Sequence, residues 1–366
     1  MTAWHRNQLA QVQRARGRLD AATQTYEQLL KATAVPGRPP VPTLGLVYVG
    51  LAEVAYKRNE LDSALRYVTE GITLCRQFLP GTPPVAGLVT LGWIRLATGD
   101  PAGALGAISE AEKAWRTTAD LLNPFPAQRA RLLLAEGDVA AAVRWTHESG
   151  LRAGDEPRYP REPGYLVLAR VLLAQERPAE ALALLDRLHA AAAAQDRVGS
   201  VIEAGALRAL ALAACGHDAD AVNALARVLA LACPQGYVRV FADGGPPMAA
   251  LLARLIAAQR AGQAAAGVPL GCLARLQRAL DVGNARPGPR SGTAPVAMPG
   301  LVEQLTSREL DVLVMLAAGR SNQAIAGQLV VTLDTVKKHV SHLLGKLGAA
   351  NRAEAVTRAR QLGLIP

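Results

Sequence analysis

The chain has 366 residues, half of them apolar and 4% aromatic, which is enough for two or three domains with a sizeable core. Alanine and leucine are commoner than valine and isoleucine, and because the first two lose little side-chain freedom in a helix, the composition predicts an all-α fold. The net charge of +10 suits a polyanionic partner, but much of the excess is arginine, so charge alone does not identify nucleic acid as that partner.

The sequence contains no run of about 18 consecutive apolar residues, and its first residues lack the apolar core of a signal peptide, so we expect no membrane segment. The cysteines at positions 75, 215, 233 and 272 are far apart and show no CxxC spacing. Cys75 and Cys215 lie in apolar helical contexts, which favours buried free thiols over disulfides or metal ligands. We therefore predict free thiols, a reducing compartment and a cytoplasmic protein.

A short phrase recurs along the first 220 or so residues. It starts with a small or polar residue, often followed by Asp, and has an alanine five positions after its start. Clear copies start at Gly17, Asn59, Gly99 and Gly137, and fainter ones at Glu176 and Gly216. The closing alanines, at positions 22, 64, 104, 142, 181 and 221, are separated by 42, 40, 38, 39 and 40 residues. A spacing this even is hard to obtain by chance.

Each phrase is predicted to join two helices. Gly or Asn ends the first helix in a left-handed cap, Asp or Pro opens the second, and the alanine lies where the two helices cross closely. The unit resembles the tetratricopeptide repeat (TPR), lengthened from its usual ~34 residues by longer loops, although several aromatic positions are aliphatic here. The resemblance implies a solenoid whose concave surface receives an unknown protein or small-molecule effector. A generic helical bundle is the alternative.

Five aromatic residues belong either to the core of this array or to its concave surface: Trp93, Trp115, Trp145, Tyr159 and Tyr165. From Cys233 the pattern changes, and residues 236–243 read Gly-Tyr-Val-Arg-Val-Phe-Ala-Asp, followed by Pro-Met and a leucine-rich helix. This phrase resembles the end of the repeat array in the large LuxR-type regulators. We therefore assign residues 1–245 to a TPR-like repeat domain and residues 246–281 to the terminal helices of the array.

Residues 282–300 are dense in proline and glycine, which cannot sustain a helix or a strand ladder, and are predicted to form a flexible linker. Residues 301–366 are predicted to form four helices. Thr306 and Glu309 form a capping box for the first helix, which stops at Gly319, and Ser321 caps the second over 322–329. The fourth is expected over about 352–362.

The third of these helices is predicted to start at the Thr332 cap and to run to about Leu347. Its apolar residues recur at i, i+4, i+7, i+8 and i+11 and are expected to face the core: Val336, Val340, Leu343, Leu344 and Leu347. The outward face then carries Lys337, Lys338, Ser341 and Gly345. Cations and hydroxyls on one side of a helix suit insertion into the major groove of DNA.

Three stretches resemble the LuxR-type helix-turn-helix: Leu305-Thr306-x-Arg308-Glu309, Gly319-x-Ser321-Asn322-x-x-Ile325-Ala326 and Thr335-Val336-Lys337-x-His339. The resemblance covers the whole four-helix domain. It implies a transcriptional regulator, an activator that binds double-stranded DNA, has RNA polymerase as a partner, and forms a homodimer through the last helix, about Arg352 to Leu362. Departures are Ala324, where many members have Glu, and Gly345, where a larger residue is common.

By position in the LuxR-type motif, the resemblance implies that Lys337, Lys338 and Ser341 face base edges. It implies contacts to the DNA backbone by Thr332, Thr335, His339, His342, Lys346, Ser321 and Asn322. We predict no cofactor and no metal: His339 and His342 are spaced i, i+3, but no third ligand lies nearby.

The large MalT-like members of this group carry an ATP-binding domain before the repeats. Its phosphate loop requires Gly-x-x-x-x-Gly-Lys-Ser/Thr, whereas Gly345-Lys346, the only Gly-Lys pair here, is followed by Leu347. The strand–helix alternation of a receiver domain and the GxSxG and HExxH motifs are absent from the sequence. We therefore predict no enzymatic activity and expect the chain to match the back half of such a regulator.

Two alternatives remain at this point. An interaction scaffold with a vestigial helix-turn-helix predicts no salt-dependent DNA binding, whereas a regulator predicts a steep fall of affinity with salt. A sigma-like promoter-recognition subunit requires a second promoter-reading region, and the sequence shows none.

Overall fold

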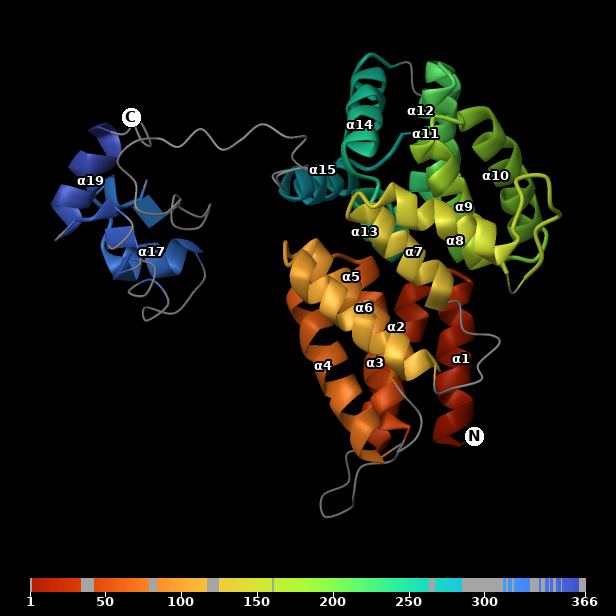
Figure 1. The fold of residues 1–366 in the computed structure, drawn as a ribbon, viewed down its shortest axis with the longest axis horizontal. Helices are drawn as coiled ribbons and strands as arrows, with labels where there is room; N and C mark the ends of the chain where they lie inside the picture. The colour runs from red at the N-terminus through yellow and green to blue at the C-terminus, as the bar shows by residue number, and fades with distance from the viewer. Residues whose placement is uncertain are drawn as a thin grey trace. The chain divides into compact units, whose positions relative to one another are not determined.

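The computed structural model describes residues 2–33, 43–78, 84–116, 125–159, 161–262, 267–284, 312–313, 315–317, 319–329, 336, 340–341, 343–344, 347–349 and 351–361. All regular structure in these residues is helical, without a strand, which confirms the all-α prediction. The chain divides into two compact units, Met1–Pro289 and Arg290–Pro366 (Figure 1). None of the described helices is both long enough and apolar enough to cross a membrane.

Six helix pairs follow one another in the described part of the first unit (Figure 1). They are α1 (Ala3–Ala15) with α2 (Leu19–Thr33), α3 (Leu44–Lys57) with α4 (Leu61–Phe78), α5 (Val85–Ala97) with α6 (Pro101–Arg116), α7 (Phe125–Ala135) with α8 (Val139–Ser149), α9 (Glu162–Ala174) with α10 (Pro178–Ala193), and α11 (Val198–Ala214) with α12 (Asp218–Ala232). The array continues with η1 (Cys233–Gln235), α13 (Arg239–Ala242), α14 (Gly245–Arg260) and α15 (Leu270–Asn284). Residues 282–284 of the predicted linker belong to α15, and its residues 285–300 lie outside the described residues.

The turns inside the six pairs share one geometry. The residue that starts each phrase has a positive φ, between 58° and 92°: Gly17, Asn59, Gly99, Gly137, Glu176 and Gly216. Its N–H bonds to the carbonyl three residues earlier, and the next N–H bonds to the carbonyl five residues before it. In the first pair these bonds are Gly17 N to Arg14 O at 3.0 Å and Arg18 N to Gln13 O at 2.9 Å. This is the Schellman motif, which satisfies the last carbonyls of a helix and confirms the predicted left-handed cap.

The closing alanine of each phrase is fully buried. The alanines at positions 22, 64, 104, 142, 181 and 221 are all 0% exposed, as expected where two helices cross closely. Two of the phrases also contain an aspartate that caps the second helix: Asp100 Oδ1 accepts from Gly103 N at 2.8 Å, and Asp138 Oδ1 accepts from Ala141 N at 2.9 Å. The turn and the crossing are therefore specified together by six consecutive residues.

The two ends of the repeat array share one hydrophobic core. This core contains Tyr26 of α2 and Leu51 of α3 together with Ile202 of α11 and Phe241 of α13, and α1 contacts α11 directly. The array therefore closes on itself, which an open solenoid would not do. Of the five aromatic residues singled out above, Trp93 and Tyr165 are buried, Trp115 and Trp145 are partly buried, and Tyr159 is 65% exposed.

Cys233 and Cys272 form a disulfide, with their Cα atoms 5.9 Å apart, so the prediction of free thiols is wrong for this pair. Cys75, which is buried, and Cys215 are free. The two bonded cysteines are 39 residues apart and meet only because the helices between them fold back, a placement that spacing along the chain does not reveal. The argument for a reducing compartment, which rested on free thiols, loses its basis.

The closing alanine provides a test of the repeat architecture. Ala104→Leu is expected to lower the free energy of unfolding by about 1–3 kcal/mol, because a fully packed crossing must shift to admit the larger side chain. Ala102→Leu, on the exposed side of the same helix α6, is the matched control. It is expected to change the free energy of unfolding by less than about 0.5 kcal/mol. Urea unfolding measures both values; equal losses would contradict the packing role of Ala104.

Candidate nucleic-acid interface

The second unit is built around a small apolar core. Its described members, all at most 3% exposed, are Val312, Leu313, Leu316, Ile325, Val336, Leu343, Leu347, Ala355 and Ala359. Val340 and Leu344 are partly buried and pack against this core. The five apolar residues predicted to face inward from the third helix therefore all do so, and this confirms the register of that segment.

The second helix of the unit, α17 (Asn322–Leu329), begins at the predicted residue. Gly319, with φ of 75°, ends the preceding turn: its N–H bonds to Leu316 O, and Arg320 N bonds to Met315 O, both at 3.0 Å. Ser321 Oγ accepts from Ala324 N at 3.2 Å, so Ser321 is the N-cap, as predicted. Its exposed hydroxyl accepts in this bond and keeps its hydrogen for an outside acceptor such as a phosphate oxygen.

Two arginines of α19 (Arg352–Gln361) hold the unit together, a role that the sequence analysis missed. The Arg352 guanidinium donates to the carbonyl of Arg320 and, at 3.4 Å, to that of Leu316, which also accepts from Gly319 N. Arg358 donates to the carbonyl of Gly348 at 2.9 Å. The positive-φ glycines at 319 and 348 were the available signal, because each marks a helix end with carbonyls that need a donor.

The structure describes three of the ten residues predicted to contact DNA. Ser321 and Ser341 are exposed and Asn322 is partly exposed, at the start of α17. Lys337, Lys338, Thr332, Thr335, His339, His342 and Lys346 lie outside the described residues, as do Thr306, Glu309 and Gly345. The DNA-contact roles of all ten remain predictions.

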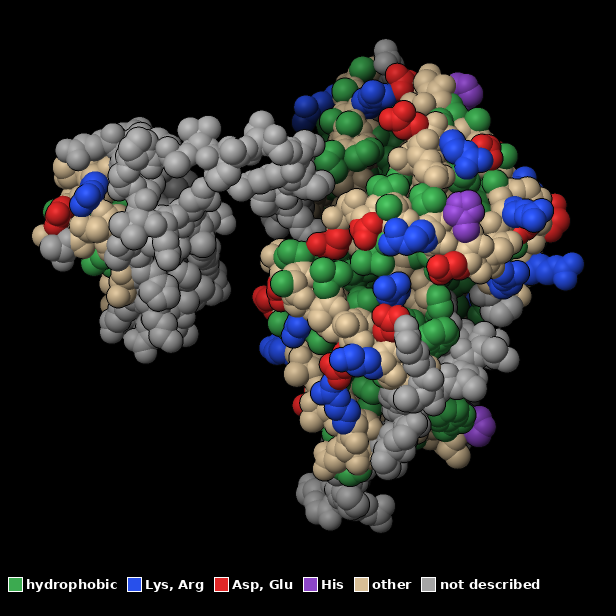
Figure 2. All heavy atoms as spheres, viewed as in Figure 1, with side chains coloured by type: hydrophobic (Ala, Val, Ile, Leu, Met, Phe, Trp, Pro, Cys, Tyr) green, Lys and Arg blue, Asp and Glu red, His purple; other side chains and the backbone are tan. Residues whose placement is uncertain are grey.

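The first unit contains a cluster of charged side chains on the first helices of its pairs. Glu203 on α11 accepts from Arg170 on α9 at 2.8 Å and lies 3.7 Å from Arg131 on α7. Asp243, just after α13, accepts from Tyr56 on α3 at 2.8 Å and lies 3.5 Å from Arg131. These ion-paired side chains are 12–24% exposed. On the face of this unit shown in Figure 2, charged side chains of both signs are interspersed over the surface.

Burial and neighbouring charges shift the pKa values in this cluster. Burial raises the pKa of Glu203, but Arg170, Arg131 and Lys57 outweigh it and hold that pKa at about 2. Burial and the nearby Arg131 lower the pKa of Arg170 to about 10, and burial lowers the pKa of Lys57. Glu203 is therefore ionised at neutral pH and, together with Asp243, balances the cations of the cluster.

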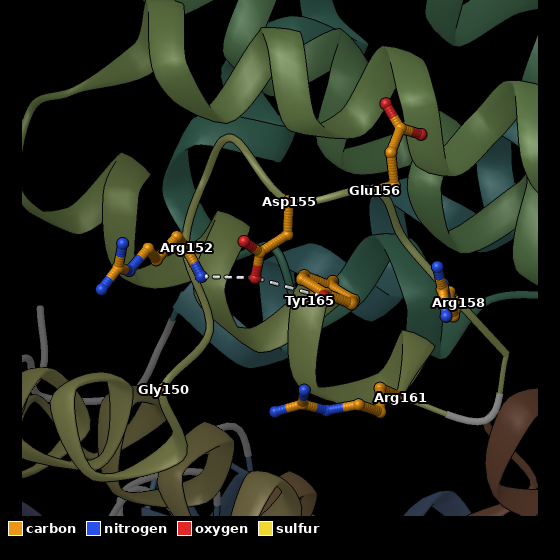
Figure 3. Close-up of a pocket in the computed structure, with 7 residues that line it drawn as sticks. All are labelled: Gly150, Arg152, Asp155, Glu156, Arg158, Arg161 and Tyr165. Carbon is orange, nitrogen blue, oxygen red and sulfur yellow. Dashed lines mark hydrogen bonds between the residues drawn. The ribbon is translucent and has the colours of Figure 1, made fainter.

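A surface pocket of about 540 Å³ lies in the segment between α8 and α9 (Figure 3). Its lining residues are Gly150, Arg152, Asp155, Glu156, Arg158, Arg161 and Tyr165. Asp155 Oδ2 accepts from Arg152 N at 2.9 Å and from the Tyr165 hydroxyl at 3.2 Å. The guanidinium groups of Arg152 and Arg158 lie on opposite sides of Asp155 and Tyr165 (Figure 3). Because the cations do not converge and the central carboxylate is already bonded, we assign this pocket no ligand.

Two family models match the chain. Residues 1–258 match the model of the MalT-like TPR region, which covers more than half of the chain. The chain belongs to this family. Residues 303–359 match the model of bacterial regulatory proteins of the luxR family. Both resemblances inferred from sequence motifs are thereby confirmed.

The HTH-type transcriptional regulator MalT of Serratia proteamaculans is 26% identical over 381 residues, which cover 98% of this chain and 40% of MalT. The response regulator protein VraR of Staphylococcus aureus and that of Staphylococcus epidermidis are each 48% identical over 65 residues, which cover 18% of this chain and 31% of VraR. The chain thus spans less than half the length of these relatives.

The charge on Glu203 makes the stability of the first unit depend on pH. Its folded-state pKa of about 2 lies below the ordinary value of 4.5, so the stabilisation is present above pH 4.5 and is lost as pH falls toward 2. Glu203→Gln is expected to remove this pH dependence and to cost roughly 3 kcal/mol at pH 7, because Arg170 loses its carboxylate.

Glu110→Gln is the matched control, since Glu110 is about half exposed in its ion pair with Arg76 and should contribute less than about 1 kcal/mol. Urea unfolding of both variants and of the unmodified chain between pH 7 and pH 2 measures these effects. Equal losses in the two variants would contradict the role assigned to Glu203.

Proposed function

We propose that this chain is a sequence-specific DNA-binding transcriptional regulator, an activator with RNA polymerase as a partner. The observation that carries the proposal is the luxR-family match over residues 303–359, on a unit whose described core has the register expected of a helix-turn-helix. The relatives are named as a transcriptional regulator and a response regulator, and we assign the chain no enzymatic role. A target on the chromosome implies a cytoplasmic location.

The register of the third helix supports the base-reading assignment. Positions 336, 343 and 347 face the core, and on an α-helix of that register positions 338 and 341 fall on the side away from the core, with position 337 on the adjoining flank. Ser341 is exposed, in agreement with this placement. We propose that Lys337, Lys338 and Ser341 enter the major groove, where lysine donates to guanine O6 and N7 and serine contacts either kind of base.

The start of α17 supports the backbone-contact assignment. A helix N-terminus presents free N–H groups and a positive dipole end to a phosphate, and Ser321 adds a hydroxyl donor beside them. We propose that Ser321 and Asn322 contact one phosphate group and that Thr332, Thr335, His339, His342 and Lys346 contact others.

We further propose a homodimer through α19 and an effector on the repeats. Ala355 and Ala359 face the core, while Ala353 and Thr357 are exposed at a spacing of i, i+4. Small side chains at this spacing allow the helix of a second copy to approach closely, and the described outer face of α19 carries no exposed large apolar residue that would drive tight association without DNA.

Lysine substitutions test the base-reading proposal. Lys337→Ala and Lys338→Ala are each expected to weaken binding to the preferred site by about 1–3 kcal/mol and to relax the sequence preference, because a donor to a base edge is lost. Lys113→Ala, which removes an exposed lysine of α6, is the matched control. It should leave the affinity and the sequence preference unchanged. Fluorescence anisotropy at fixed salt gives the affinities. Retained sequence preference in both variants would contradict the assignment.

The salt dependence of binding separates the regulator from an interaction scaffold with a vestigial helix-turn-helix. Neutralised phosphates release counterions, so the logarithm of the association constant should fall linearly with the logarithm of salt concentration, with a slope of about −0.9 per phosphate contact. Lys346→Ala, which removes a proposed phosphate contact, should make the slope less steep by about one unit. The absence of salt-dependent DNA binding would favour the interaction scaffold and contradict the regulator.

A further inference from the structure

The segment that follows the sixth helix pair lies against the end of α3. Val238 N bonds to Lys57 O at 2.8 Å, and Arg58 Nε donates to Gln235 O at 3.3 Å. The Tyr56 hydroxyl donates to Asp243 Oδ2 at 2.8 Å, and Arg239 donates to Asn59 Oδ1 at 3.3 Å. Four hydrogen bonds thus join residues 56–59 to residues 235–243. We call residues 235–243 the clasp.

The clasp also contacts the first helix pair and is itself buried. Gln235 Oε1 accepts from Asp20 N, at the start of α2, at 3.2 Å. Tyr237, Val238 and Phe241 are 2%, 5% and 1% exposed, and all three belong to the core shared by the two ends of the array. Closure of the array therefore depends on the clasp.

The disulfide lies directly beside the clasp. Cys233 begins η1, two residues before Gln235, and Cys272 lies in α15, the last described helix of the first unit. The bond therefore ties the start of the clasp to α15, which also packs on α13 within the clasp. Both cysteines are nearly buried, at 8% and 4% exposed, so a solvent thiol reaches them only when this region opens.

We propose that Cys233 and Cys272 form a thiol–disulfide switch that sets how firmly the clasp closes the repeat array. Reduction takes two molecules of a low-molecular-weight thiol such as glutathione. The first, as a thiolate, attacks one sulfur, forms a mixed disulfide and releases one cysteine thiolate; the second displaces the other cysteine. Two cysteine thiols and one glutathione disulfide result, with two electrons and two protons taken from the two glutathione molecules.

The reduced unit stays folded, because free cysteines pack as small apolar groups and the rest of the core is unchanged. It opens at the clasp more often, because the open state is no longer restrained by the cross-link. The coupling is reciprocal: loss of the disulfide loosens the clasp, and loss of a clasp bond exposes the disulfide. This inference concerns the first unit alone and does not depend on the proposed DNA binding.

The first test measures the rate at which dithiothreitol reduces the disulfide in the full chain. Maleimide labelling of the released thiols reports this rate. Tyr56→Phe removes the hydrogen bond to the Asp243 carboxylate and is expected to raise the rate roughly tenfold, the effect of losing a hydrogen bond to a charged group. Tyr159→Phe, the matched control, changes an exposed tyrosine and should leave the rate unchanged. Equal rates in the two variants would overturn the proposal.

The second test measures the clasp directly and keeps the proposal falsifiable if a tyrosine variant folds poorly. Reduction of the unmodified chain should speed hydrogen exchange at the Val238 amide and trypsin cleavage after Arg239, which is 8% exposed. The Cys233→Ser/Cys272→Ser variant should behave like the reduced chain. Unchanged exchange and cleavage would overturn the proposal, as would a chain in which glutathione disulfide forms no bond between these two cysteines.

Discussion

The structure of the first unit depends on one repeated constraint: a left-handed residue that ends a helix, followed five positions later by an alanine with no room for a larger side chain. The left-handed residue turns the chain back, and the alanine lets the second helix cross the first closely. Six copies build the array, and all six alanines are fully buried. Glu176 shows that this geometry does not require glycine, although a non-glycine residue in the left-handed region carries a conformational cost.

Stacking of consecutive repeats and closure of the array together place charged groups beside one another. Arg131, Arg170 and Glu203 come from three different helix pairs, and Asp243 comes from the segment after the sixth pair. Ions taken partly out of water are stable only when paired, so closure and pairing depend on each other. A TPR array that closes with its own C-terminal segment has less free concave surface than an open solenoid, and an effector on the repeats has to bind a closed array or open it.

The features that the sequence predicted correctly are local ones. The Schellman turns, the buried alanines, the Ser321 cap and the inward face at positions 336–347 each follow from residues within about a dozen positions of one another. The features that it did not predict join distant residues: Cys233 with Cys272, Tyr56 with Asp243, and Arg352 with Arg320. Spacing along one chain carries no information about such pairs. The DNA-contact residues were inferred from a family motif, which assigns roles by position.

The most direct test of the central claim is selection of DNA from a random pool by the full chain, with the Lys337→Ala/Lys338→Ala variant beside it. A sequence-specific dimeric regulator is expected to enrich a short site with approximate two-fold symmetry, and the variant is expected to lose that site while keeping weak binding. If the unmodified chain enriches no sequence, in either the oxidised or the reduced state, the proposal that it is a DNA-binding regulator is contradicted.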